Sequence, residues 1–331
     1  MNTDRPNGPT TRPRAVLAAA AALTASFVLA AGPGVMAADE DRSVVATTEV
    51  LGSLVSQLVG DAAEVTVIMP SGANPHSYEP SARDAERILG ADVVVSNGLE
   101  LEEALLTVLE SAASDGATWF QAAEHITVRE LGTASDDEHH ADDDEAEHAE
   151  HHADAGDHEH VHGAEDPHIW TDPLAMRDVV LALGPVLEEA GIAVGDGASD
   201  LADELEALDA TVAAILATVA DEDRKLVTGH RSLGYFADRY GFARIGTVIP
   251  SLSTSGEPTA RELAQLIEDI KANEVRAVFA EVGTPQAVAE AVASDSGVEL
   301  VAFSTSQLPE GGTYQDLIVE IATTVAGALS P

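Results

Sequence analysis

Histidine is the residue type with the clearest chemical potential in this sequence, and its distribution is uneven. Eight of the twelve histidines lie between Asp136 and Gly163, together with twelve carboxylates and no Lys or Arg. The eight are His139, His140, His148, His151, His152, His158, His160 and His162. Imidazole nitrogen and carboxylate oxygen are common ligands of divalent metals. This segment therefore consists almost wholly of metal-binding side chains.

Three of the other four histidines lie where a folded site could form. His76 is in the loop NPHSYEP, directly after the predicted strand EVTVIM, and His230 ends the predicted strand KLVTGH. His168 lies between prolines in EDPHIWTDP. Open α/β sheets bind ligands at the carboxyl ends of their strands, so these three residues favour a metal site. His125, in AAEHITV, has no such context and is interpreted as a surface or structurally satisfied histidine.

The ligand types limit the choice of metal. The sequence contains no cysteine, so thiolate ligands, thiol catalysis and a lipid-modified cysteine are not expected. Zinc takes imidazole nitrogen in a tetrahedral shell, and three histidines leave one position open. Copper and nickel also suit neutral imidazole, whereas manganese and calcium prefer oxygen and fit less well.

Strand and helix patterns alternate along the chain and predict an α/β fold with parallel sheets covered by helices. In the first half, strands are predicted at 43–47, 64–69 and 91–96, with helices at 48–60 and 79–90. In the second half, strands are predicted at 224–230, 243–249, 275–281 and 298–303, with helices at 232–241, 258–273, 285–297 and 314–329.

The domain organisation follows from breaks in this pattern. Residues 1–38 resemble an export signal, with Arg5, Arg12 and Arg14 before an apolar run and small residues after it; an uncleaved anchor is the alternative. We predict an N-terminal α/β lobe at 39–197, interrupted at 133–164 by a disordered His/Asp/Glu-rich loop. A long apolar stripe predicts a helix at 198–221 that links this lobe to a C-terminal α/β lobe at 222–331. An ordinary core helix of one larger domain would have the same stripe.

The charge balance bears on partners. With 58 acidic and 16 basic residues the formal net charge is −42. Nucleic-acid binding needs a basic surface, so this partner is excluded. An acidic surface instead raises the local concentration of cations.

Five motifs together resemble the metal-binding solute receptors of ABC importers. They are NPHSYEP, DPHIWTDP, GHRSLGYFADRYG, SGEPTARELAQLIEDIK and AVFAE, in this order along nearly the whole chain after residue 38. The His-rich insertion before DPH resembles the zinc-specific, ZnuA-like branch. The resemblance implies two α/β lobes joined by a rigid helix, with the metal in the cleft between them. It also implies an exported, monomeric receptor that delivers Zn²⁺ to a membrane permease and has no catalytic residues.

By motif matching, the three histidine ligands of that family correspond to His76, His168 and His230. Many relatives carry an Asp where this sequence has Thr305, in FSTSQ, and its loss favours zinc over manganese. The fourth ligand stays open between a water molecule near Thr305, Glu257 and Glu281. Beside such a site, the His-rich loop is interpreted as a weak zinc collector, with a solvated linker as the alternative.

Two other functions fit parts of the sequence. A zinc hydrolase could use three histidines and a bound water, but the sequence has no HExxH helix and no GxSxG elbow. A metal buffer would use the His-rich loop alone. A receptor for manganese, copper or nickel is the remaining alternative.

Overall fold

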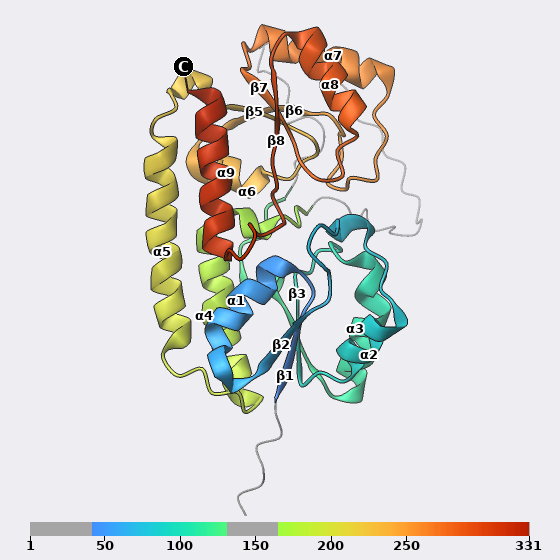
Figure 1. The fold of residues 1–331 in the computed structure, drawn as a ribbon, viewed down its shortest axis with the longest axis vertical. Coiled ribbons are helices and arrows are strands. Elements are labelled where there is room, and N and C mark those ends of the chain that lie inside the picture. The colour runs from blue at the N-terminus through green and yellow to red at the C-terminus, as the bar shows by residue number, and fades with distance from the viewer. Residues whose placement is uncertain (1–41, 131–164, 331) are drawn as a thin grey trace, which may run out of the picture. The chain divides into compact units, whose positions relative to one another are not determined.

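The computed structural model describes residues 42–130 and 165–330 (Figure 1). These residues form two four-stranded parallel sheets with flanking helices, which confirms the predicted α/β fold with two lobes. The predicted signal peptide and the eight histidines between Asp136 and Gly163 lie outside the described residues. Within the described part of the chain, no helix is long and apolar enough to cross a membrane.

The first lobe contains the sheet β2-β1-β3-β4. Its strands and helices are β1 (Ser43–Ala46), α1 (Glu49–Val59), β2 (Glu64–Val67), α2 (Ala82–Leu89), β3 (Val93–Ser96), α3 (Leu106–Asp115), β4 (Thr118–Gln121) and α4 (Pro173–Glu189). Sequence patterns did not identify α3, β4 or α4. The edge strand β4 is short, and its aromatic residues Trp119 and Phe120 are its main strand signal.

The second lobe repeats the strand order, with the sheet β6-β5-β7-β8. Its elements are β5 (Lys225–Thr228), α6 (Gly234–Tyr240), β6 (Ala243–Thr247), α7 (Ala260–Ala272), β7 (Ala277–Ala280), α8 (Gln286–Ser296), β8 (Glu299–Ala302) and α9 (Tyr314–Leu329). All eight of these elements lie within or close to the predicted ranges.

Capping residues fix the starts of three helices. Ser81 and Asp84 form a capping box at α2, Thr259 and Glu262 form one at α7, and Thr313 and Asp316 form one at α9. In each box the hydroxyl accepts from a backbone N–H and the carboxylate accepts from the capping residue, so two otherwise unpaired donors are satisfied.

The long helix α5 (Gly197–Leu216) ends five residues before the predicted end at 221. The Arg224 guanidinium donates to the carbonyl oxygens of Leu216 and Val219, so a side chain satisfies carbonyl groups that follow the last turn. The predicted apolar stripe is buried, from Leu201 to Leu216.

Helix α5 packs against α4 and α9, and α9 also contacts α1 (Figure 1). One continuous core contains Leu54 of α1, Leu205 of α5, Phe279 of β7 and Tyr314 of α9. Since this core joins side chains from both sheets, the two halves of the chain are held together by apolar packing. The domain boundaries at 197 and 222 stay predictions.

Candidate metal centre

His76, His168 and His230, far apart in the sequence, meet at one point. Nε2 of His168 lies 3.2 Å from Nε2 of His76 and 3.1 Å from Nε2 of His230. One ligand nitrogen of each residue lies within 4.8 Å of the others, and this is the one such group found among the described residues. Three imidazoles that turn the same nitrogen toward a shared point can hold one cation.

Short local structures bring each histidine to this point. His76 lies in the 3₁₀ turn Pro75–Ser77, where Asn74 caps the turn by accepting from the backbone N–H of His76 at 3.1 Å. His230 follows β5 by two residues, at the carboxyl edge of the second sheet. His168 immediately precedes the turn Ile169–Thr171, which leads into α4.

Buried carboxylates lie behind two of the three rings. Oδ1 of Asp166 lies 2.7 Å from Nδ1 of His168 and also accepts from the His168 backbone N–H at 3.0 Å. Oε1 of Glu281 lies 2.7 Å from Nδ1 of His230, although the ring is not aligned as in a regular hydrogen bond. A carboxylate at Nδ1 leaves the Nε2 lone pair for the metal and fixes the ring orientation.

The environment keeps His76 and His168 neutral. Burial, with repulsion from His168 and His230, lowers the pKa of His76 to about 2. Burial also lowers the pKa of His168, although the Asp166 carboxylate opposes this shift. Since metals bind unprotonated imidazole, these two residues need lose no proton to bind a cation at neutral pH.

The carboxylate of Glu281 is held by the backbone of the loop that carries His230. It accepts from the N–H groups of Gly229 and His230 and from the Ser232 hydroxyl at 2.5 Å. Burial alone would raise the pKa of Glu281, but His230 and these donors outweigh it, and the pKa lies below its ordinary value. Both oxygens are therefore occupied behind His230, which argues against Glu281 as a fourth ligand.

A cavity of about 270 Å³ lies at the three histidines. Thr305 and Thr254 are among its lining residues, whereas Glu257 is exposed and does not line it. Thr305 is 4% exposed, and its carbonyl accepts from the Trp170 indole at 2.6 Å. Of the three candidates for the fourth position, Thr305 is the one that faces this space.

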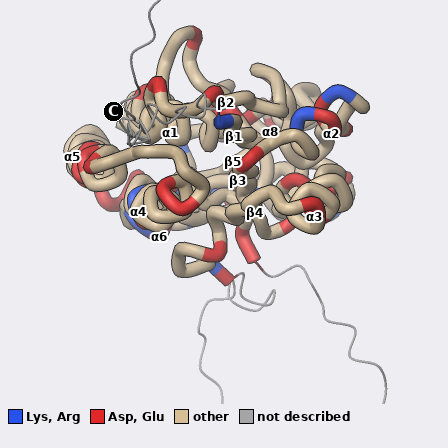
Figure 2. The backbone as a smooth tube through the Cα atoms, turned by 90° about the horizontal axis from the view of Figure 1, so that it is seen from below, with Lys and Arg blue, Asp and Glu red and all other residues tan. Residues whose placement is uncertain are grey.

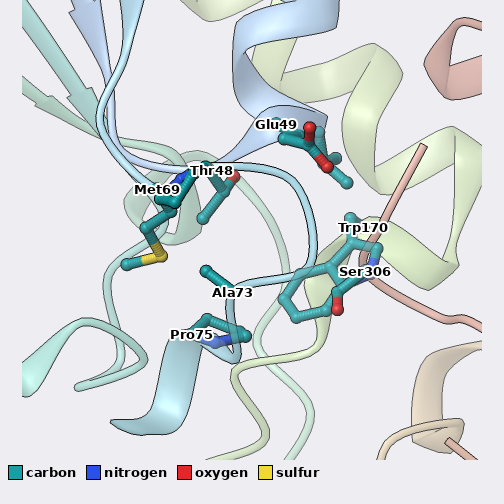
Figure 3. Close-up of a pocket in the computed structure, with 9 residues that line it drawn as sticks. Thr48, Glu49, Met69, Ala73, Pro75, Trp170 and Ser306 are labelled. Carbon is teal, nitrogen blue, oxygen red and sulfur yellow. The ribbon is translucent and has the colours of Figure 1, made fainter. Parts of the chain in front are cut away.

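A second pocket of about 330 Å³ shares Pro75, Trp170 and Ser306 with the histidine cavity. Met69, Ala73, Pro75 and Trp170 surround a common space in this pocket (Figure 3). Its lining contains no histidine, so the metal chemistry belongs to the neighbouring cavity.

The sequence interpretation treated His125 correctly and missed several supporting residues. His125 is exposed and stacks on Phe120 with a centroid separation of 4.4 Å. Asp166, Asn74 and Trp170 were not identified. Only Asp166 had a usable signal, because an acidic residue two positions before a metal-ligating histidine can reach its ring.

Comparisons with known proteins identify the family of this chain. The family model described as "Zinc-uptake complex component A periplasmic" matches residues 44–328. The manganese-binding lipoprotein MntA of Halalkalibacterium halodurans is 26% identical over 301 residues, which are 88% of this chain and 89% of MntA. The zinc-binding lipoprotein AdcA of Streptococcus pneumoniae is 27% identical over 79% of this chain, but the match spans only 49% of AdcA.

Solved structures show the same fold. The periplasmic zinc-binding protein TroA of Treponema pallidum superposes with a TM-score of 0.71 at 23% identity and covers 88% of this chain and 100% of TroA. A zinc-bound deletion mutant of ZnuA gives a TM-score of 0.69 at 22% identity, over 88% of this chain and 99% of that chain.

The family match extends over most of the chain, and this family consists of substrate-binding receptors. The zinc hydrolase considered from the sequence is therefore wrong. The chain belongs to the family of zinc-uptake complex component A, whose members are metal-binding receptors of ABC importers and not enzymes.

Proposed function

We propose that this protein is an extracytoplasmic receptor that captures Zn²⁺ with His76, His168 and His230 and delivers it to the membrane permease of an ABC importer. The convergence of three Nε2 atoms carries the proposal. The likeness to relatives named for metal binding supports the class of function.

The identity of the metal needs a separate argument, since the relatives are named for different ions. MntA is named for manganese, AdcA for zinc, and MtsA of Streptococcus pyogenes for iron. Here the donors that meet are three imidazole nitrogens, and the cavity wall has a threonine at position 305. Manganese favours oxygen ligands more than zinc does, so this donor set supports zinc; a receptor for manganese, copper, nickel or iron is the second candidate.

A competition experiment tests the choice. Metal-free protein is offered zinc, manganese, copper, nickel and ferrous iron at equal free concentrations, and the bound ion is identified by native mass spectrometry. We expect one tightly held zinc. Preferential retention of manganese or iron would reject zinc as the cargo and keep the receptor function, whereas no tight binding of any ion would reject both.

We propose that the His-rich segment at 133–164 collects additional zinc weakly and that the chain acts as a monomer. Deleting residues 136–162 should remove only the weaker zinc ions in a titration. Loss of the tight ion would mean that the loop supplies an essential ligand.

Analytical ultracentrifugation of the zinc-loaded protein tests whether the chain is a monomer, because it gives the mass of the species in solution.

We further propose that the chain is exported and that the signal peptide is removed after Ala37 or Ala38. N-terminal sequencing of exported protein checks the cleavage, and a first residue of Met1 would contradict it. The relatives MntA and AdcA are named lipoproteins, whereas the present sequence contains no cysteine.

A further inference from the structure

The side of the metal centre away from the cavity contains an arginine without an assigned role. Arg129 lies beside Asp166, the carboxylate behind His168, and its side chain is 13% exposed. Its Nη1 lies 3.2 Å from Oδ2 of Asp166, and its Nε donates at 2.7 Å to Oδ2 of Asp238 on α6. One guanidinium thus contacts both the residue that orients His168 and a helix of the second sheet.

Asp166 needs this partner because it is completely buried. Its Oδ1 is occupied by the backbone N–H and Nδ1 of His168, so Oδ2 is the oxygen left for Arg129. A buried carboxylate oxygen without a donor is unfavourable. Without Arg129, the carboxylate would gain by rotating toward another donor, and its alignment with His168 would be lost.

The backbone around Arg129 is fixed independently of the guanidinium. The N–H of Asp166 donates to the Arg129 carbonyl at 3.0 Å, and Glu130 pairs with Glu165 in an antiparallel bridge. The Tyr235 hydroxyl accepts from the Arg129 N–H at 2.9 Å and donates to the Asp166 carbonyl at 3.0 Å. The two segments therefore stay beside α6 even when the arginine side chain is changed.

Close packing at the start of α6 makes this contact specific. A Cβ at Gly234 would collide with Oδ2 of Asp166 and would lie 2.8 Å from Nη1 of Arg129. Gly234 begins α6 and follows His230 by four residues, with a short turn from Ser232 N–H to the His230 carbonyl at 2.9 Å. A shift of α6 would therefore also move His230, because the segment that connects them is short and folded into a turn.

We propose that Arg129 is a positioning residue that holds Asp166 against His168 and, through Asp238, sets the separation at which His168 and His230 receive the metal. The inference rests on the proposed metal site. Because Arg129 contacts both Asp166, which lies behind His168, and α6, which follows His230 closely in the chain, it controls the rate at which the metal leaves as well as the affinity.

The test compares Arg129→Gln, Arg129→Lys and the control Arg244→Gln. Gln removes the positive charge and the planar set of guanidinium donors. Lys keeps the charge but can reach only one of the two carboxylates, Asp166 or Asp238. Arg244 donates to Oδ1 of Asp238 at 2.9 Å and makes no hydrogen bond or ion pair with Asp166 in the described part of the chain, so its loss perturbs only the contact at Asp238. We expect Arg129→Gln to weaken zinc binding by about tenfold or more and to speed its release, the range usual for groups that orient metal ligands. Lys should recover part of the loss, and Arg244→Gln should stay within about twofold of the wild type.

Cobalt provides a readout that a purely structural salt bridge would not change. The visible absorption of bound Co²⁺ reports its coordination geometry, and Arg129→Gln should shift this spectrum. If the variant only melts at a lower temperature, with zinc affinity, release rate and cobalt spectrum as in the wild type, the inference is overturned. Equal losses in Arg129→Gln and Arg244→Gln would overturn it as well, because Arg244 does not bond to Asp166 and the loss would then not depend on holding Asp166 against His168.

Two further results separate this inference from the proposed function. If Arg129→Gln does not fold, Asp238→Asn replaces it, because this change frees α6 and leaves the Arg129–Asp166 contact in place. Faster zinc release in Asp238→Asn supports the link to α6, and an unchanged rate overturns it. A wild-type protein that binds neither zinc nor cobalt would instead contradict the metal site itself.

Discussion

The two sheets have the same strand order but carry the histidines of the proposed metal site at different places. In the second sheet, His230 follows the inner strand β5 by two residues, whereas the residue at the matching place after β1 is Thr48, which caps α1. In the first sheet, the loop between β2 and α2 carries His76, whereas the matching loop between β6 and α7 carries Thr254. The two sheets therefore share one strand order, and single residues at the carboxyl ends of their strands give them different roles.

A buried glutamate fixes the carboxyl edge of each sheet, and the two glutamates differ in electrostatics. Glu102 accepts from the Thr47 hydroxyl and from the N–H groups of Asn97 and Gly98, and burial raises its pKa. Glu281 accepts comparable bonds beside His230, which helps to keep its pKa below the ordinary value. The first glutamate fixes a loop, whereas the second also provides a negative charge behind a metal ligand.

The three histidines differ in the same way. His168 and His230 are 1% and 4% exposed and have a carboxylate behind them, whereas no carboxylate lies near His76 among the described ion pairs. The His76 turn is tied to the second sheet by the bond from Asn74 to the Thr254 hydroxyl, at 2.7 Å. Two of the three proposed ligands are thus fixed by buried carboxylates, whereas the turn that carries the third is held by one hydrogen bond to Thr254. The acidic residues visible along the backbone in Figure 2 are consistent with attraction of cations to the surface.

The largest effect should come from removing one histidine. Each of His76→Ala, His168→Ala and His230→Ala should weaken zinc binding by about tenfold or more, since only two imidazoles remain in a site suited to four donors. His168→Ala should lose most, because Asp166 also loses its partner. Competition with a chromophoric chelator measures the constants. If two of the three changes had no effect, the site would be misplaced.

The next prediction compares the two glutamates. Glu281→Gln should weaken zinc by about 10- to 100-fold, because the ring of His230 loses its anionic partner. Glu102→Gln is the matched control: its raised pKa already brings it closer to the neutral form, and it does not contact a ligand. It should change the zinc constant by less than about threefold, as expected for a change outside the metal site. Equal effects of the two substitutions in isothermal titration would show that the charge behind His230 is unimportant.

A smaller effect is expected at the contact that holds His76. Asn74→Ala or Thr254→Val should weaken zinc about fivefold, in line with a net contribution of about 1 kcal/mol for one hydrogen bond. The loss should appear mainly as faster zinc release, followed by stopped-flow mixing with a chelator. The double variant should lose little more than either single variant, because both remove the same bond. Additive losses would mean that the two residues act separately.

The sequence singled out the three histidines that meet, but few of the residues that orient them. His76 and His230 follow predicted strands of the two parallel sheets, whose carboxyl ends are the usual place of ligand sites, and His168 lies between two prolines. Arg129 acts through distances and burial, which no local pattern encodes, and Asp166 is marked only by its place two residues before His168. The elements α3, β4 and α4 were missed for a related reason: packing against the rest of the first lobe stabilises them more than their own periodicity does.

The smallest effect concerns Thr305, which lines the cavity at the three histidines. No Asp or Glu is among the described residues that line this cavity. A neutral threonine hydroxyl is a poor zinc ligand, so we propose that it holds a water at the fourth position by a hydrogen bond. Thr305→Ala should then weaken zinc by only about two- to threefold, well below the loss for a histidine, because a weakly held water can find other partners.

The reverse substitution, Thr305→Asp, should give the site an anionic oxygen donor. It should tighten zinc binding and improve the relative affinity for manganese, which favours oxygen ligands. Thr305→Asn is the control, since it has a similar shape and no charge. Titrating zinc and manganese against all three variants gives the answer. If Asp changed neither affinity, residue 305 would lie too far from the metal to coordinate it, and the charge of the bound cation would be balanced only by Asp166 and Glu281 from behind the histidines.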